Sequence, residues 1–242
     1  MKKAIGKLFL ILMLFVIYAP ILILAVYSFT DSGNIGSIHG FSMQNYVTLF
    51  TKGELRDMIV GTVLLALVSS LLATIFGTMG AIGAFYSKKL AKNFINTANQ
   101  IPVVNADVVT GFSICVLLIV AFGMNKESYV PLLIGHVVLS APFVYLSVVP
   151  KLKQMDASLY EAAMDLGASP SMALRKVVIP QIMPGIVSGF ALAITLSLDD
   201  YFIASYTKPA TFNTISTYVV NATKGSQTEI KTALWALSTV IF

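Results

Sequence analysis

Uncharged apolar stretches of membrane-spanning length dominate this chain. A helix needs about 20 mostly apolar residues to cross the hydrocarbon core of a bilayer. Candidate spans of this kind lie at 8–29, 58–84, 97–122, 129–149, 182–205 and 232–242. The last stretch ends at Phe242 after about 16 Å of helix, so it is an incomplete span. The pattern predicts an all-α membrane protein with about six transmembrane helices in a single domain over residues 1–242.

Composition and charge placement agree with a membrane protein. Of the 242 residues, 57% are hydrophobic and only 11% are charged, which argues against a soluble enzyme or a nucleic-acid-binding domain. With a cytoplasmic N-terminus, ten of the 16 basic residues would lie in inner segments, as the positive-inside rule requires. The net charge of +5 is then a topology signal, and nucleic acid is not an expected partner. The first span reads as an uncleaved anchor.

The polar segment 151–181 carries strong signals for local structure. Residues 158–166 favour a helix, and Gly167 stands where a helix would end. Ser169 and Pro170 can cap and begin a second helix, expected over 171–178 and ended by Pro180. Two short helices that meet at a glycine bend predict a compact cytoplasmic docking element rather than a flexible linker.

This segment contains a recognisable motif. Glu161-Ala162-Ala163, three residues, Gly167, nine residues and then Val177-Val178-Ile179-Pro180 follow the pattern E-A-A-x3-G-x9-I-x-L-P with two conservative changes. The sequence therefore resembles the permeases of bacterial binding-protein-dependent ABC importers, which share the MetI-like permease fold. In that family the loop couples the membrane subunit to a separate ATPase. The resemblance implies ATPase-coupling roles for Glu161, Ala162, Ala163, Gly167 and Pro180.

Further segments resemble the spermidine/putrescine branch of this family: Tyr18-Ala19-Pro20, Asp107 to Gly111, Asp156 to Gly167, and Ser197 to Asp200. The resemblance implies a multi-pass protein of the bacterial cytoplasmic (inner) membrane that is not itself an enzyme. Its implied partners are membrane lipid, a homologous second permease, an ATPase dimer that binds ATP and Mg, and an extracytoplasmic polyamine-binding protein. Related branches carry other small substrates on the same scaffold.

Three carboxylates stand within the apolar spans, and these are candidates for the substrate path: Asp107, Asp199 and Asp200. An Asp at a helix centre costs about 2.5–3.5 kcal/mol on insertion scales, so such a residue usually faces a polar cavity or a partner. Polyamines carry several ammonium groups joined by methylenes. Carboxylates suit the ammonium groups, and the aromatic faces of Tyr18 and Tyr201 suit cation–π contacts. Asp200 points about 100° away from Asp199 on a helix and could instead cap an interface.

Helical spacing assigns neighbours to these acids. Asp107 should share a stripe with Asn96, Gln100 and Thr110, and Asp199 should continue one formed by Gly185, Ser188, Ala191 and Thr195. Gly185 and Gly189 form a G-x-x-x-G pattern suited to close helix packing. His136 is expected to form an interhelical hydrogen bond.

Motif absences narrow the function further. The sequence has no phosphate-loop pattern G-x4-G-K-[ST], so a partner must bind ATP, and no cofactor or metal site is expected in this chain. Three alternatives remain: an importer permease for another small substrate, an ATP-independent cation channel or secondary carrier, and an aspartyl hydrolase using Asp199 and Asp200. Adjacent residues on one helix point apart, which disfavours the hydrolase.

Overall fold

The structure is a computed structural model that describes residues 2–30, 40–156, 158–224 and 235–239. Helices dominate this part of the chain, and its extended pairing is a single bridge between Thr30 and Phe41. The chain forms two compact units, residues 1–59 with 218–242 and residues 60–217. Four helices are long and apolar enough to span a membrane, or up to five if one bent pair counts as a span. The predicted stretch 232–242 lies mostly outside the described residues.

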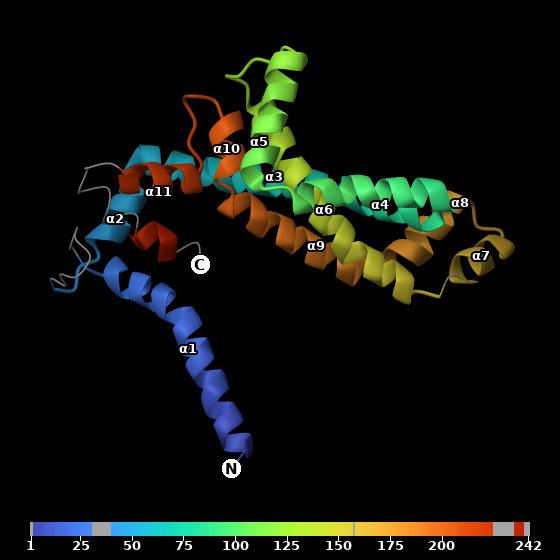
Figure 1. The fold of residues 1–242 in the computed structure, drawn as a ribbon, viewed down its shortest axis with the longest axis horizontal. Helices are drawn as coiled ribbons and strands as arrows, with labels where there is room; N and C mark the ends of the chain where they lie inside the picture. Colours follow the sequence, from blue (N-terminus) through green and yellow to red (C-terminus); the bar gives the residue numbers. More distant parts are fainter. Residues whose placement is uncertain (1, 31–39, 157, 225–234, 240–242) are drawn as a thin grey trace. The chain divides into compact units, whose positions relative to one another are not determined.

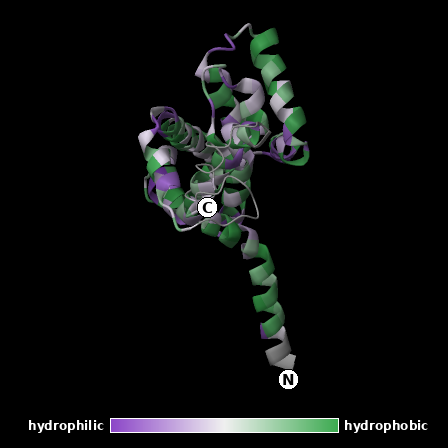
Figure 2. Ribbon diagram, turned by 90° about the vertical axis from the view of Figure 1, so that its left-hand side faces the viewer, coloured by the Kyte–Doolittle hydropathy of each residue, from purple (hydrophilic) through white to green (hydrophobic). Residues whose placement is uncertain are grey.

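The first unit contains α1 (Lys2–Ser28), α2 (Gln44–Thr51), the beginning of α3 (Gly53–Tyr86) and most of α11 (Ile215–Lys224). Asn45 of α2 fastens this helix to the end of α1, because its amide donates to the carbonyls of Ser28 at 3.0 Å and Thr30 at 2.6 Å. Most side chains of α1 are apolar, as the green of its ribbon in Figure 2 shows. Many of them are exposed, among them Leu8, Phe15 and Leu22. Such a surface suits lipid or a partner subunit.

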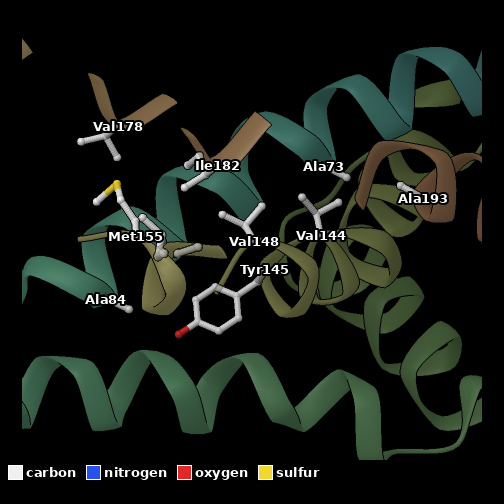
Figure 3. Packing of buried hydrophobic residues seen from close by; sticks show 11 residues of the cluster. Ala73, Ala84, Val144, Tyr145, Val148, Met155, Val178, Ile182 and Ala193 are labelled. Atoms are coloured by element: carbon white, nitrogen blue, oxygen red, sulfur yellow. The ribbon is translucent and has the colours of Figure 1, made fainter. Parts of the chain in front are cut away.

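The second unit is built around α6 (Tyr129–Gln154) and α9 (Ile179–Asp199), which pack along most of their length. Small residues allow the close approach. A Cβ added to Gly185 would lie 2.9 Å from the Ser147 carbonyl oxygen, and one added to Gly189 would lie 3.1 Å from the Val144 Cα. The predicted packing role of this glycine pair is therefore confirmed. Figure 3 shows the core that results, which includes Val144, Tyr145, Val148 and Ile182 with alanines of α3.

The stretch predicted as one span at 97–122 consists of two helices and a terminal π-turn. The first helix is α4 (Lys89–Val104), and α5 (Asp107–Cys115) follows it and runs into η1 (Val116–Ala121). Asn105 and Ala106 have extended backbones, and the two helices bend by 108° (Figure 1). Pro102 lacks the N–H that would support the last turn of α4, which favours the break there. The Tyr145 hydroxyl donates to Asn96 and so ties α4 to α6.

The expected helix over 171–178 does not stop at Pro180. Residues 170–199 form one continuous helical segment of α8 (Pro170–Ala173), η2 (Leu174–Val178) and α9. Pro180 occupies the first turn of α9, directly after the π-helical turn η2. The π-helical turn takes up the missing N–H and the ring of the proline, so the helix continues through this position. At the other end α9 stops at Asp199, so the predicted span 182–205 also ends early, and α10 (Phe202–Thr207) follows as a separate helix.

Candidate functional site

The segment 151–181, predicted to be cytoplasmic, folds around α7 (Ser158–Asp165), and both ends of this helix are held by hydrogen bonds. At its start, Asp156 Oδ1 accepts from the Ser158 amide at 3.0 Å and from the Ser158 hydroxyl at 2.8 Å. These two hydrogen bonds hold the pKa of the Asp156 carboxyl below its ordinary value. The loop therefore presents a defined helix start.

Gly167 ends α7 in a Schellman motif. Its φ is +86°, a conformation that strains any residue with a Cβ. The Gly167 amide donates to the Met164 carbonyl at 2.9 Å, and the Ala168 amide donates to the Ala163 carbonyl at 3.0 Å. Ser169 then caps α8, since its hydroxyl accepts from the Met172 amide at 3.4 Å. The bend and the cap predicted from the sequence are thus both present.

One side of α7 is attached to the protein and the other is open. Leu159 and Tyr160 pack against the hydrophobic core, and the Tyr160 ring lies 4.9 Å from that of Tyr86. Glu161 and Ala162 are exposed, whereas Ala163 is half-buried. Leu166 is 90% exposed, an unusual position for a leucine outside a lipid-facing span. Leu166 was not among the predicted site residues, although a large apolar side chain directly before the glycine of the bend is a signal present in the sequence.

The membrane acids lie at helix breaks. Asp107 is the first residue of α5 and Asp199 the last residue of α9, and both are exposed. Asp200 follows with an extended backbone and is only 8% exposed. Its carboxylate accepts from the amides of Ile203 at 3.1 Å and Ala204 at 2.7 Å, so it caps α10. Of these acids, Asp107 and Asp199 are therefore open to an incoming ligand.

The break before α5 corrects one predicted stripe. Asn96 and Gln100 belong to α4, and Asp107 and Thr110 belong to α5, so they do not share one straight helix. The second stripe falls within the continuous α9, where Thr195 and Asp199 are exposed and Gly185 is buried against α6. The predicted stripe of α9 therefore lies on one unbroken helix. The stripe predicted through Asp107 is interrupted by the extended backbone of Asn105 and Ala106.

The remaining candidates take different places. Tyr201 is half-buried, and its ring meets Phe202 edge-on at 5.3 Å, whereas Tyr18 is exposed on α1 in the first unit. His136 is fully buried on α6, with Nδ1 3.0 Å from the Leu132 carbonyl oxygen and Nε2 3.7 Å from Asp200 Oδ2. Sequence periodicity could not pair His136 with Asp200, because the two lie far apart in the chain. Among the described residues, no group of three or more potential metal ligands comes together.

Long apolar helices, the fastened helix α7 and acids at helix breaks are consistent with a membrane transport component. The chain belongs to the family described as "Binding-protein-dependent transport system inner membrane component", which it matches over residues 73–242. It is thus a multi-pass, non-catalytic inner-membrane permease that works with an ATPase and a binding protein, and the partner ATPase handles ATP.

Two curated relatives extend this assignment over most of the chain. The chain is 31% identical over 232 residues to the spermidine/putrescine transport system permease protein PotC of Haemophilus influenzae, covering 94% of this chain and 90% of that protein. It is also 31% identical to the putrescine transport system permease protein PotI of Escherichia coli, covering 93% and 81%.

Among solved structures, the chain resembles a subunit of a bacterial ABC transporter involved in the import of the acidic polysaccharide alginate. The TM-score is 0.74 at 18% identity, and the match covers 99% of this chain and 90% of that one. At this identity the likeness supports the fold of an ABC importer permease and says nothing about the substrate.

Proposed function

We propose that this permease carries polyamines, spermidine or putrescine, into the cell. The relatives named for these substrates match nearly the whole chain at about one residue in three. Asp107 and Asp199 add a chemical reason, since both are exposed carboxylates at the ends of apolar helices. Carboxylates pair with ammonium groups, and the half-buried Tyr201 offers an aromatic face nearby in sequence. Asp200 takes part indirectly by holding α10, and Tyr18 is a further candidate on α1.

We propose that α7 and the bend at Gly167 form the surface that the ATPase grips. One observation carries this assignment: α7 is fastened through Leu159 and Tyr160, yet it leaves Glu161, Ala162 and Leu166 exposed. A rigid helix with one free side can transmit a push or pull into α8 and α9, with which it is nearly continuous in sequence. Pro180 lies in that connection, in the first turn of α9.

The proposed assembly contains this chain, a homologous second permease, an ATPase dimer and an extracytoplasmic polyamine-binding protein. The chain acts as a single permease domain, with its N-terminus and the segment 151–181 on the cytoplasmic side. ATP binding would draw the coupling segments of the two permeases together, and hydrolysis would let them part. A membrane potential favours cation entry by about 2.3 kcal/mol per charge per 100 mV. Coupling to ATP adds gating, so that smaller ions do not leak.

Transport in proteoliposomes tests this function. The complete importer is reconstituted with its binding protein, and entry of radiolabelled spermidine, putrescine and arginine is measured with ATP or a non-hydrolysable analogue inside. We expect ATP-dependent entry of a polyamine and no entry of arginine. Uptake that is indifferent to ATP would favour a channel or secondary carrier. A binding protein that binds no polyamine would overturn the substrate assignment and leave the permease class intact.

A further inference from the structure

The end of α9 is shaped by a single buried carboxylate. Helix α9 stops at Asp199, and Asp200 takes an extended conformation with φ −64° and ψ 121°. Its two carboxylate oxygens accept from the first amides of α10, those of Ile203 and Ala204. The position of α10, and of the residues on either side of Asp200, therefore depends on this carboxylate.

Helix α10 has little freedom to shift because Ile203 packs directly against glycines of two neighbouring helices. A Cβ added to Gly111 of α5 would lie 3.0 Å from the Cα of Ile203, and one added to Gly135 of α6 would lie 2.6 Å from its Cγ2. Because α10 packs this closely on the two glycines, it has little room to rotate about its axis. The carboxylate of Asp200 is held at one place in the protein interior as a consequence.

His136 faces this carboxylate from α6. Its Nδ1 lies 3.0 Å from the Leu132 carbonyl oxygen, and a carbonyl only accepts, so Nδ1 carries a proton. Its Nε2 is completely buried, has no hydrogen-bond partner, and lies 3.7 Å from Asp200 Oδ2. In the neutral ring, this nitrogen would direct a lone pair at a buried carboxylate. That arrangement leaves the negative charge without a cation in a low-dielectric site, which is costly.

The surrounding groups sharpen this conflict. Asp107 of α5 adds a second negative charge that acts on Asp200. The backbone of Ser197 on α9 lies near the His136 ring. Helix α10 supplies only the two amides that Asp200 already uses. One additional proton removes the conflict, either on Nε2, which gives an imidazolium–carboxylate pair, or on Asp200, which gives a neutral acid.

We propose that Nε2 of His136 and the carboxylate of Asp200 share one proton, in addition to the proton on Nδ1, and that the two residues together fix the break between α9 and α10. As positioning residues they place Asp199 and Tyr201, which lie on either side of Asp200. The role assigned to Asp199 rests on the proposed substrate path, but the paired proton and the placement of α10 do not depend on the substrate. A helix end in a membrane has backbone amides without partners. Asp200 accepts from two such amides of α10, and the proton shared with His136 balances the charge of its carboxylate.

A set of four variants tests the pairing through the sign of their interaction. His136→Leu leaves Asp200 without its partner, and we expect uptake by the whole importer to fall about tenfold or more. Adding Asp200→Asn to that variant removes the stranded charge, so the double variant should recover part of the loss. His136→Gln keeps a donor toward Asp200 and should retain most transport. Ser140→Ala is the matched control, one turn along the same helix, fully buried and also without a hydrogen-bond partner.

A labelling measurement keeps the test independent of the substrate. Ser205 is exposed on α10, and Cys115, the chain's only cysteine, can be replaced by serine, which preserves a donor to the Tyr206 carbonyl. In the assembled importer, maleimide labelling of Ser205→Cys should change in the His136→Leu background and return toward the original rate in the double variant. Equal labelling in every background would overturn the positioning role, even if no polyamine is transported. Additive damage in the double variant would overturn the charge pairing.

Nitrogen NMR of the imidazole tests the proton directly in the importer in lipid nanodiscs, with only this chain labelled and with His39→Asn leaving His136 as its only histidine. We expect a ring with both nitrogens protonated, or a neutral ring protonated at Nδ1 beside a carboxylic acid that disappears in Asp200→Asn. A neutral ring protonated at Nε2 alone would overturn the proposal.

Discussion

At the scale of single residues, the bend that we propose couples this chain to the ATPase depends on one backbone conformation. Gly167 has φ +86° and Gly123 has φ +64°, the two left-handed residues in the part of the chain that the structure describes. A Cβ at either site would meet open space, so an alanine there is strained only through the backbone. Alanine variants at these two sites should therefore carry similar backbone strain, and only the variant at Gly167 alters the bend after α7.

Gly167→Ala and Gly123→Ala should each lower the free energy of unfolding by about 1 kcal/mol, because each forces an alanine into the left-handed region. Only Gly167→Ala should also reduce ATP-driven uptake, since it alone redirects the chain that joins α7 to α8. Thermal unfolding in detergent and uptake in proteoliposomes measure the two effects. Equal uptake by both variants would show that the bend angle does not matter for coupling.

Asp156 offers a residue-scale test by titration. Its pKa lies below the ordinary value because the folded loop supplies two donors from Ser158, and removing the hydroxyl in Ser158→Ala should raise it partway toward that value. The stabilisation is present above the unfolded-state pKa of about 3.9 and is lost as the pH falls through the lower folded value. Carbon NMR of the labelled carboxyl measures the shift. An unchanged pKa would mean that the amide alone sets it.

At the scale of helices, contact between backbones decides which small residues matter. The three glycines in the last part of α3 meet different surroundings: a Cβ on Gly77 would lie 2.7 Å from the Ala141 carbonyl oxygen, one on Gly80 3.7 Å from the Tyr145 ring, and one on Gly83 in open space. Spacing in the sequence treats these glycines alike. Only the register of α3 against α6 distinguishes them, and no local pattern encodes that register.

Gly77→Ala and Gly83→Ala should therefore change stability in opposite directions. Alanine at Gly83 gains helix propensity of up to about 1 kcal/mol, whereas alanine at Gly77 must push α6 away and should cost roughly 1–3 kcal/mol. Unfolding of the purified permease by a denaturing detergent gives both values. Stabilisation by Gly77→Ala would contradict the close packing of α3 on α6.

The ends of the helices show which features could be predicted from the sequence and which could not. Apolar length predicted the long helices, and capping chemistry predicted the bend at Gly167 and the cap at Ser169, because these signals are local. The arrest of α9 at Asp199 and the pairing of Asp200 with His136 depend on contacts between distant segments, so no window of sequence contains them. The prediction that Pro180 ends a helix was wrong because the π-helical turn before it lets the helix continue, and the sequence carries no local signal for that turn.

The two exposed acids at these breaks give an element-scale prediction. Asp107→Asn and Asp199→Asn should each weaken polyamine uptake several-fold without loss of the assembled importer, because neither carboxylate supports the fold through a buried contact. Transport rate and co-purification of the subunits are measured on the same samples. Loss of the complex would assign these residues a structural role, and full transport would remove them from the path.

At the scale of the whole molecule, we propose that the ATPase binds this chain at α7 and the bend at Gly167. Leu166, 90% exposed beside the bend, contrasts with the fully buried Leu152 of α6. A leucine exposed in the isolated chain contributes nothing to its fold, but burial in a partner is worth about 1.5–3 kcal/mol. Removal of this side chain should therefore lower the affinity between permease and ATPase and leave the stability of the isolated permease unchanged.

We expect Leu166→Ser to weaken association with the ATPase by roughly tenfold or more while the isolated permease unfolds at its original temperature. Leu152→Ser should have the opposite signature, because a hydroxyl and a cavity in the core destabilise the permease by about 2–5 kcal/mol. Affinity of the ATPase for permease in nanodiscs and thermal unfolding of the permease are the two measurements. Leu166 is almost fully exposed, so its replacement should change the affinity only through direct contact with the ATPase. Unchanged affinity in Leu166→Ser would therefore show that the ATPase binds this chain elsewhere.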